Sequence, residues 1–143
     1  MTVTAQELQE MYELFNNNDS TAIVNQFAPG AVYKQLDTGQ VAVGHEQIAI
    51  AMANWKTFFL NAQIGDFRIQ PADELVEAQV GAVQCYVVNF VGVGRYDQTI
   101  SGLEQVAPAN HRDVRLPISE TVWLNGAGQL VRVDNAISIT ALQ

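Results

Sequence analysis

The chain has 143 residues, of which 48% are apolar, and its 15 Asp and Glu against 7 Lys and Arg give a net charge of −8. This length and composition predict one globular domain, residues 1–143. The few basic residues are scattered, so they offer no positive patch to a phosphate backbone or an anionic membrane, and we expect neither nucleic acid nor membrane as a partner.

The single cysteine, Cys85, excludes an internal disulfide. It lies within the apolar run 83–93, which predicts a buried thiol without a chemical role. The N-terminus leads directly into a polar helix and lacks the apolar core of a secretory signal. No apolar run reaches the ~20 residues that span a bilayer. We therefore expect a cytoplasmic protein.

Two short amphipathic helices are predicted at the start of the chain. Thr4 and Glu7 have the spacing of a capping box, which places a helix start near residue 5. The apolar face of this helix consists of Leu8, Met11, Tyr12 and Phe15. The polar run 16–19 ends the first helix, and Pro29 with Gly30 ends the second. The cap of the second helix is Asp19 or Ser20.

A β-hairpin and a longer helix follow. Residues 31–36 and 41–43 are predicted to pair as two strands, and a helix runs from about residue 45 to residue 60. The inward face of this helix consists of Ile48, Met52, Trp55 and Phe59. Its two large aromatic residues, Trp55 and Phe59, either belong to an ordinary core or form the wall of a cavity.

The second half of the chain is predicted to consist mainly of strands. They cover residues 62–70, 74–80, 82–93, 118–124 and 130–140, and residues 95–101 continue the third of them or pair with it. Residues 102–116 are predicted to form a long loop, and an Asn-Gly step marks a turn at 125–128. Helices followed by strands with short connections indicate the α+β class with an antiparallel sheet.

Strand alternation predicts which side chains face inward. On the last strand Asn135 shares a face with Val131, Val133, Ile137 and Ile139, so it is the one polar group in an apolar wall. On the preceding strand Glu120 shares a face with Ile118, Val122 and Leu124. On the first strand Tyr33 and Gln35 point to the same side. Asp134 points outward as a partner of Arg132.

Glu120 is the leading candidate for chemistry. A carboxyl group among aliphatic side chains is desolvated, and this raises its pKa toward the range in which it can donate or accept a proton near neutral pH. Two other interpretations stay open: Glu120 pairs with a basic residue of the long loop, or its strand is turned over and the carboxylate faces water. The basic residues concerned are Arg112, Arg115 and His111. Asn135 holds either a ligand oxygen or a buried water.

Four segments carry a resemblance to a known family. They are the Asn-rich helix break at 16–19, Phe-Ala-Pro at 27–29, Gly-His-Glu-Gln-Ile at 44–48, and Trp-Leu-Asn-Gly-Ala-Gly-Gln-Leu-Val at 123–131. In this order and spacing they resemble the NTF2-like superfamily and, within it, the SnoaL-like branch of polyketide cyclase-like proteins. The resemblance implies a cone-shaped fold in which three N-terminal helices pack on a curved, mostly antiparallel sheet. It also implies a homodimer formed through the outer face of that sheet.

The ketosteroid isomerase branch of this superfamily provides a sharper comparison. Aligned by the shared segments, its general-base aspartate falls at Gln35, its hydrogen-bonding tyrosine at Met11, and its protonated aspartate at Glu120. Tyr12 is adjacent to Met11, but one helical position rotates a side chain by about 100°. Because glutamine cannot serve as a base, this comparison argues against ketosteroid isomerase activity.

The SnoaL-like cyclases imply a cofactor-independent mechanism in which a carboxylate moves a proton next to a carbonyl group. In this chain Glu120 would be the acid/base. Tyr33, Gln35 and Asn135 would orient an oxygen of the substrate, and Trp55 and Phe59 would stack on a flat, apolar ligand. The alternative is a non-catalytic ligand-binding or protein-association module in which Glu120 only satisfies structural partners.

Other chemistries find little support in the sequence. His45 and His111 lie far apart without acidic partners at ligand spacing, so we expect no metal. We expect no cofactor either, because Gly92-Val93-Gly94 is not followed by the helix that a phosphate-binding loop requires.

Overall fold

A computed structural model describes residues 2–73 and 81–143. The described part of the chain forms three α-helices, two 3₁₀-helices and six strands. In chain order they are α1 (Ala5–Glu13), η1 (Leu14–Asn17), α2 (Ser20–Val24), β1 (Phe27–Gln35), β2 (Gln40–Val43), α3 (Gly44–Phe58), β3 (Phe59–Pro71), β4 (Ala82–Tyr96), β5 (Asp113–Asn125), β6 (Leu130–Ile137) and η2 (Ile139–Leu142). The strand predicted at 74–80 lies outside the described residues. No helix within 2–73 or 81–143 is long and apolar enough to cross a membrane.

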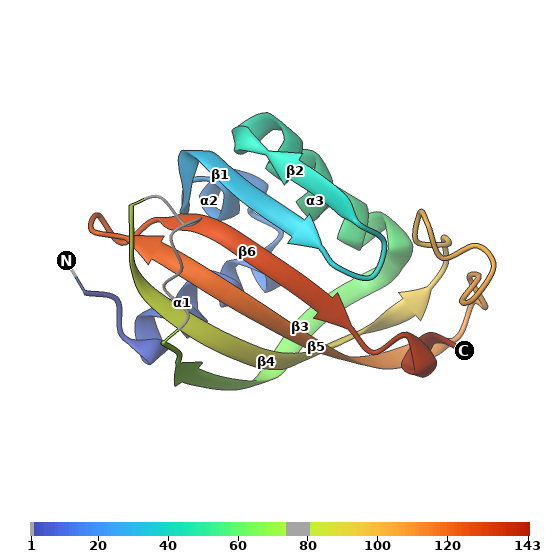
Figure 1. The fold of residues 1–143 in the computed structure, drawn as a ribbon. Helices are drawn as coiled ribbons and strands as arrows, with labels where there is room; N and C mark the ends of the chain where they lie inside the picture. Colours follow the sequence, from blue (N-terminus) through green and yellow to red (C-terminus); the bar gives the residue numbers. More distant parts are fainter. Residues whose placement is uncertain (1, 74–80) are drawn as a thin grey trace.

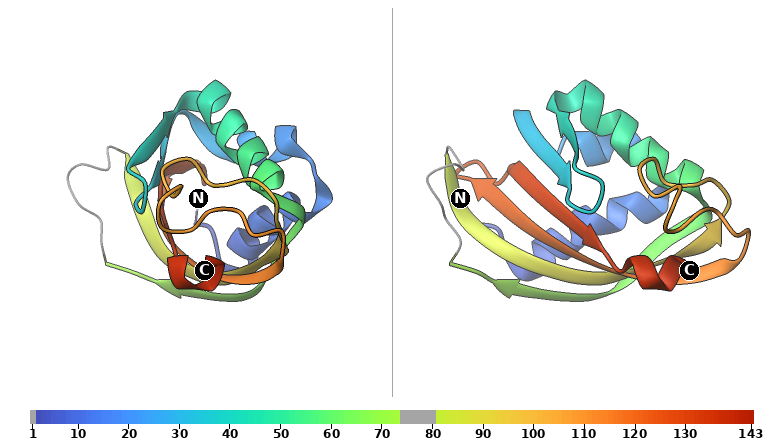
Figure 2. Two further views of the ribbon diagram at one scale, coloured as in Figure 1. Left: turned by 90° about the vertical axis from the view of Figure 1, so that its right-hand side faces the viewer. Right: turned by 45° about the vertical axis from the view of Figure 1, so that its right-hand side comes forward.

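The strands form one sheet in the order β2-β1-β6-β5-β4-β3 (Figure 1). Neighbouring strands are antiparallel except β1 and β6, which run parallel. The sheet curves, and the helices lie on its concave side, with α3 packed on β1 and β3 and α1 packed on β3 (Figure 2). The expected α+β architecture is confirmed.

Local signals set the ends of the first two helices. The side chain of Thr4 accepts a hydrogen bond from the backbone N–H of Glu7, whose side chain accepts one from the N–H of Thr4, so the predicted capping box forms. Asn18 adopts a left-handed conformation with φ of 56° and ends η1. Asp19 caps α2 by accepting from the N–H of Ala22.

The Asn-rich break also ties the helices to the sheet. The side chain of Asn16 accepts a hydrogen bond from the N–H of Ile64 at 2.7 Å and donates one to its carbonyl oxygen at 2.8 Å. Ile64 lies in β3 between two register shifts, where Asn61 and Asp66 have positive φ. Irregularities of this kind bend a strand, so Asn16 joins η1 to the curved part of the sheet.

Several predicted boundaries were wrong. The second helix ends at Val24 instead of near Pro29, because Phe27 already pairs with Leu130 of β6. Pro29 has no N–H to donate, and it lies within the irregular stretch of that pairing. The long helix ends at Phe58, and Phe59 has the extended dihedral angles of a strand residue.

The strands after residue 80 also differ from the prediction in length. The loop predicted at 102–116 covers residues 97–112, because residues 113–116 pair with β4 and lengthen β5. Of the predicted segment 95–101, only the first two residues continue β4. The last strand ends at Ile137 instead of residue 140, and the chain then turns into η2.

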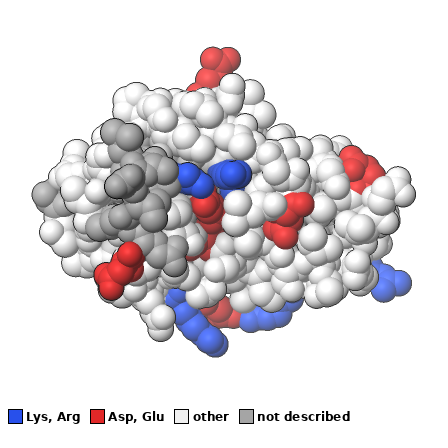
Figure 3. Space-filling model, in the orientation of Figure 1, with Lys and Arg blue, Asp and Glu red and all other residues white. Residues whose placement is uncertain are grey.

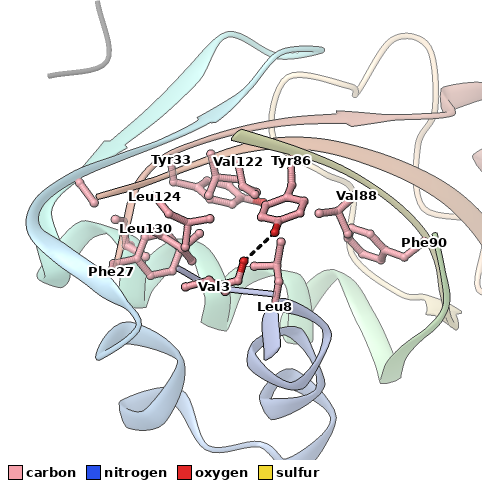
Figure 4. Packing of buried hydrophobic residues seen from close by; sticks show 13 residues of the cluster. Val3, Leu8, Phe27, Tyr33, Tyr86, Val88, Phe90, Val122, Leu124 and Leu130 are labelled. Atoms are coloured by element: carbon pink, nitrogen blue, oxygen red, sulfur yellow. Dashed lines mark hydrogen bonds between the residues drawn. The ribbon is translucent and has the colours of Figure 1, made fainter. Parts of the chain in front are cut away.

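Two apolar clusters fill the interior. The larger one joins α1, α3 and four strands, and its members Val3, Leu8, Phe27, Tyr33, Tyr86, Val88, Phe90, Val122, Leu124 and Leu130 are labelled in Figure 4. Within it the hydroxyl of Tyr86 donates to the carbonyl oxygen of Val3 at 2.6 Å. Cys85 is buried, as predicted.

The smaller cluster anchors the 97–112 loop through Tyr96, whose side chain has no exposed surface. Its hydroxyl donates to the carbonyl oxygen of Ala107 at 2.6 Å and accepts from the N–H of Ile100 at 3.0 Å. We expect Tyr96→Phe to lower the free energy of unfolding by about 1–3 kcal/mol, because both backbone groups lose a buried partner. Urea unfolding followed by circular dichroism measures the change, and an unchanged midpoint would contradict this role.

Candidate ligand-binding site

A cavity lies between the helices and the concave face of the sheet. Its volume is about 110 Å³. One water molecule needs only about 10–15 Å³ on this scale, so the cavity is far larger than a packing defect. Its wall is mostly apolar and includes Met11, Phe15, Met52, Phe90, Leu116 and Val133. The polar side chains in the wall are Tyr12, Gln26, Tyr33, Trp55, Gln63, Glu120 and Asn135.

Glu120 is the one carboxylate among the described residues that line this cavity, and it is 7% exposed. Strand alternation in β5 turns it inward on the same face as the buried Val122, as expected. Its Oε1 accepts a hydrogen bond from the hydroxyl of Tyr12 at 2.6 Å. Its Oε2 accepts from Nδ2 of Asn135 at 2.7 Å and from the hydroxyl of Tyr33 at 3.4 Å. All of these partners are uncharged groups.

The basic residues of the long loop are not the partners of Glu120. Arg115 forms a salt bridge with Asp66, and Nδ1 of His111 lies 3.3 Å from Asp97. The alternative in which Glu120 pairs with the loop is therefore wrong, and so is the alternative of an exposed carboxylate. Asp134 pairs with Arg132 at 2.7 Å, as predicted.

Tyr12 is the site residue that sequence reasoning missed. Met11 stands at the position where the resemblance expects a hydrogen-bonding tyrosine, and the rotation of about 100° between adjacent helical positions argued against Tyr12. In the structure both side chains line the cavity, and it is Tyr12 whose hydroxyl reaches Glu120. The available signal was a tyrosine on the apolar face of α1, because a buried phenol hydroxyl needs a partner.

Asn135 and Gln35 form a fixed chain of amides behind Glu120. Nε2 of Gln35 donates to Oδ1 of Asn135 at 3.0 Å and to Oδ2 of Asp37 at 2.8 Å. Oε1 of Gln35 accepts from the N–H of Thr38 at 2.8 Å. Because both hydrogens of the Gln35 amide are used, Oδ1 of Asn135 must face Gln35, and its NH₂ group must face Glu120.

Gln35 itself lies outside the cavity wall, contrary to the role expected for it beside the ligand oxygen. Its side chain is buried and donates to Asn135, which does line the cavity. It lines instead a neighbouring hollow beside α3. The structure thus places Gln35 as a support for Asn135.

Trp55 and Phe59 both line the cavity, although Phe59 comes from β3 and not from the helix. Their rings stack with centroids 6.3 Å apart and an interplanar angle of 18°. Nε1 of Trp55 donates to the hydroxyl oxygen of Tyr33 at 3.1 Å. Tyr33 therefore uses its oxygen to accept from Trp55 and its hydrogen to reach Glu120.

Burial raises the pKa of Glu120 above its ordinary value, and the hydrogen bonds from Tyr12, Asn135 and Tyr33 oppose this shift. The pKa of Tyr12 and that of Tyr33 lie well above the ordinary value, first because of burial and then because of the adjacent carboxylate. Glu120 is therefore the group of this cluster that changes its charge at the lowest pH.

This shift predicts a pH dependence of stability. A carboxyl whose folded-state pKa exceeds the unfolded value of about 4.3 binds its proton more tightly in the folded protein. Its contribution to the free energy of unfolding is complete below about pH 4.3 and is lost as the pH rises through the folded-state pKa. We expect the wild-type protein to lose more stability than Glu120→Gln between pH 4.3 and neutral pH, as measured by urea unfolding; parallel curves would contradict a raised pKa.

Among residues 2–73 and 81–143, no group of three or more His, Cys, Asp or Glu side chains is placed to hold a metal ion. His45 is half-buried, and its Nε2 lies 2.8 Å from the carbonyl oxygen of Phe27, so it joins α3 to β1. His111 is exposed on the 97–112 loop.

No protein-family model matches the chain, and no curated protein matches its sequence. Solved structures do match it. A proposed polyketide cyclase from Pseudomonas putida is similar over 98% of this chain and 96% of its own, with a TM-score of 0.73 and 19% identity. A proposed SnoaL-like polyketide cyclase from Jannaschia sp. is similar over 99% and 94%, with a TM-score of 0.69 and 18% identity.

A third similar structure is a protein from Catenulispora acidiphila with a ketosteroid isomerase-like fold, solved in complex with trimethylamine. It covers 97% of this chain and 91% of its own, with a TM-score of 0.71 and 15% identity. The protein therefore has the NTF2-like fold that SnoaL-like polyketide cyclases and ketosteroid isomerase-like proteins share, as the sequence resemblance predicted.

Proposed function

We propose that this protein binds a small apolar carbonyl compound in its cavity and moves a proton of that compound without a cofactor, as a cyclase or isomerase of the SnoaL-like type. One observation carries the proposal: a buried carboxyl group, Glu120, stands in a mostly apolar cavity, and its hydrogen-bond partners among the described residues are all uncharged donors. A carboxyl in such surroundings is suited to general acid–base catalysis.

The hydrogen bonds of Glu120 distinguish its two oxygens. Oε2 accepts from Asn135 and Tyr33, whereas Tyr12 is the one donor to Oε1 among residues 2–73 and 81–143. Oε1 therefore keeps a lone pair that can take a proton. The Asn135 NH₂ group, held by Gln35, keeps Oε2 as an acceptor. The proton of a neutral Glu120 thus belongs on Oε1, next to the oxygen of Tyr12.

This arrangement couples proton removal to stabilisation of negative charge. Anionic Glu120 takes the proton from a carbon next to the carbonyl group of the ligand; the C–H bond breaks, an O–H bond forms at Oε1, and the electron pair moves to the carbonyl oxygen. Neutral Glu120 then donates to Tyr12. The Tyr12 hydroxyl, no longer donating to the carboxylate, turns its own hydrogen toward the enolate oxygen. Return of the proton at another atom, or attack of the enolate within the same molecule, completes an isomerisation or a ring closure.

Deuterium exchange tests this proposal without knowledge of the natural substrate. Acetophenone is a small aromatic ketone whose α-hydrogens exchange with D₂O once they are removed as protons, and NMR follows their loss. We expect the protein to bind acetophenone and to accelerate this exchange. Acceleration should rise with pH through the raised pKa of Glu120, because the base is the anion. Binding without any accelerated exchange would reject acid–base catalysis.

The alternative function is non-catalytic ligand binding. The observation that favours it is that both oxygens of Glu120 have partners within the protein, and none of the described side chains buried with it lacks a hydrogen bond. A network that is already complete can serve structure alone. The exchange experiment separates the two functions, because a binder would take up acetophenone and leave its α-hydrogens in place.

We also propose that two copies associate through the outer face of the sheet. Figure 3, in the orientation of Figure 1, shows mostly uncharged residues on this face, with Lys or Arg and Asp or Glu side chains together near its middle and others around its edge. Strand β4, which lies between β5 and β3, has apolar residues pointing to both sides, and Val83 is 53% exposed. Burial of such a surface favours association. Light scattering on the purified protein should give twice the chain mass, and a monomer would contradict the proposal.

A further inference from the structure

A second hollow lies beside the cavity and is called the outer groove here. It is formed by the β1–β2 hairpin, one face of α3 and Ile100 of the 97–112 loop, and has a volume of about 240 Å³. Its α3 side presents Gln47, Ile50 and Asn54, which follow one another at helical spacing. Exposed residues border it, so it is open to solvent.

The outer groove differs from the cavity in chemistry. Its polar lining consists of amide and hydroxyl side chains, namely Gln35, Thr38, Gln40, Gln47 and Asn54, together with Tyr33 and Trp55. None of the described residues that line it carries a charge. Gln47 uses its Oε1 to accept from the N–H of Val43, and within the described part of the chain its amide hydrogens have no hydrogen-bond acceptor. Such a surface suits an uncharged group with a hydroxyl or an amide, because a charge would find no counter-ion.

The wall between the two spaces is one layer of side chains. Tyr33 and Trp55 line both of them and are joined by a 3.1 Å hydrogen bond. Gln35, which lines the groove, donates to Asn135, which lines the cavity. A molecule that breaks the hydrogen bond between Trp55 and Tyr33 and passes between the two side chains can therefore extend from the cavity into the outer groove.

We propose that the cavity and the outer groove bind the two ends of one elongated molecule: an apolar carbonyl end beside Glu120, and an uncharged end bearing a hydroxyl or amide group beside Asn54. This inference rests on the proposed function, because the carbonyl end is assigned to the cavity there. It adds the class of ligand, a carbonyl compound with a neutral, hydrogen-bonding tail.

Three probes test the inference by isothermal titration calorimetry. Acetophenone is long enough to occupy only the cavity. The second probe, 1-phenylhexan-1-one, adds an apolar chain, and the third, 6-hydroxy-1-phenylhexan-1-one, ends the same chain in a hydroxyl group. We expect the hydroxyl to tighten binding roughly 3- to 10-fold relative to the apolar chain, which is the worth of one hydrogen bond. A hydroxylated probe that binds no more tightly than its apolar counterpart would overturn the inference.

Substitution of Asn54 locates the tail. Asn54 is exposed on α3, so Asn54→Leu should fold normally, and we expect it to remove the preference for the hydroxyl while acetophenone binds as before. Gln6→Leu also replaces an exposed amide side chain with leucine, but on α1, away from the groove. It is the control and should keep the preference for the hydroxylated probe. A preference that survives Asn54→Leu would reject the groove as the site of the tail. If the wild-type protein does not bind acetophenone at all, the proposed function is overturned, and this inference with it.

The wall provides a second variant. Trp55→Phe keeps an aromatic ring but removes the N–H that donates to Tyr33. Because a long ligand no longer has to replace that bond, we expect the affinity of the hydroxylated probe to rise relative to that of acetophenone. An unchanged or lower ratio would contradict passage of the ligand between Trp55 and Tyr33.

Discussion

Glu120→Gln is expected to abolish accelerated deuterium exchange of acetophenone while leaving its binding nearly unchanged. Glutamine has the same shape as glutamate but cannot take a proton at neutral pH. Loss of a positioned general base lowers rates by about 10²–10⁴-fold, which would bring the exchange close to the uncatalysed rate. NMR in D₂O measures the rate, and calorimetry measures the affinity.

The same variant separates chemistry from folding. Removal of a buried carboxylate eliminates its desolvation cost, so we expect Glu120→Gln to unfold at no lower urea concentration than the wild-type protein at neutral pH. Glu10→Gln, an exposed residue of α1, is the matched control and should keep the full exchange rate. Exchange that persists in Glu120→Gln would show that another group removes the proton.

Asn135→Asp is expected to be among the most destabilising single substitutions at this site. Nδ2 of Asn135 lies 2.7 Å from Oε2 of Glu120, so the variant would place two carboxyl groups within hydrogen-bonding distance in a buried site. Two such groups cannot both ionise, and one of them retains a proton. We expect a loss of about 3 kcal/mol in the free energy of unfolding at neutral pH, as for other buried charges without a compensating partner.

The pH dependence identifies the cause. The new carboxyl has a folded-state pKa raised above the unfolded value of about 3.9, so its destabilising effect grows as the pH rises through the folded-state pKa and fades toward acidic pH. Urea unfolding at several pH values follows this effect. Asp134→Asn, the neighbouring residue on the opposite face of β6, should show a small change. A pH-independent loss in Asn135→Asp would indicate altered packing instead of charge.

The sequence was sufficient wherever a structure depends on neighbouring residues. The capping box at Thr4 formed as predicted, and the cap of α2 formed at Asp19, one of the two residues predicted for it, because each cap involves backbone groups only a few residues away. The hairpin after Ala31 and the turn at Asn125 follow from local turn chemistry. Alternation along β5 and β6 placed Glu120 and Asn135 on the inner face, and their strands pair them directly.

Predictions were less accurate where the structure of a segment depends on contacts with residues far away in the sequence. The second helix was predicted too long, because the sequence around Phe27 does not show that this residue pairs with Leu130. The strand character of residues 113–116 depends on β4. Tyr12 and Glu120 are separated by 108 positions, and no periodicity along α1 shows which side chain will meet β5. Gln35 was expected beside a ligand, but the contacts of Asp37 and Asn135 fix it behind the wall.

The amino-acid sequence by itself determined the class of fold, the inward faces of the strands and the presence of a carboxyl in an apolar wall. These follow from hydrophobic periodicity and from hydrogen bonds between near neighbours, which each segment carries independently of the others. Only the tertiary structure decided which donors surround Glu120 and that an uncharged groove lies across Trp55 and Tyr33 from the cavity. The physical reason is that these contacts join segments far apart in the chain, and their geometry exists only after the sheet has curved around the helices.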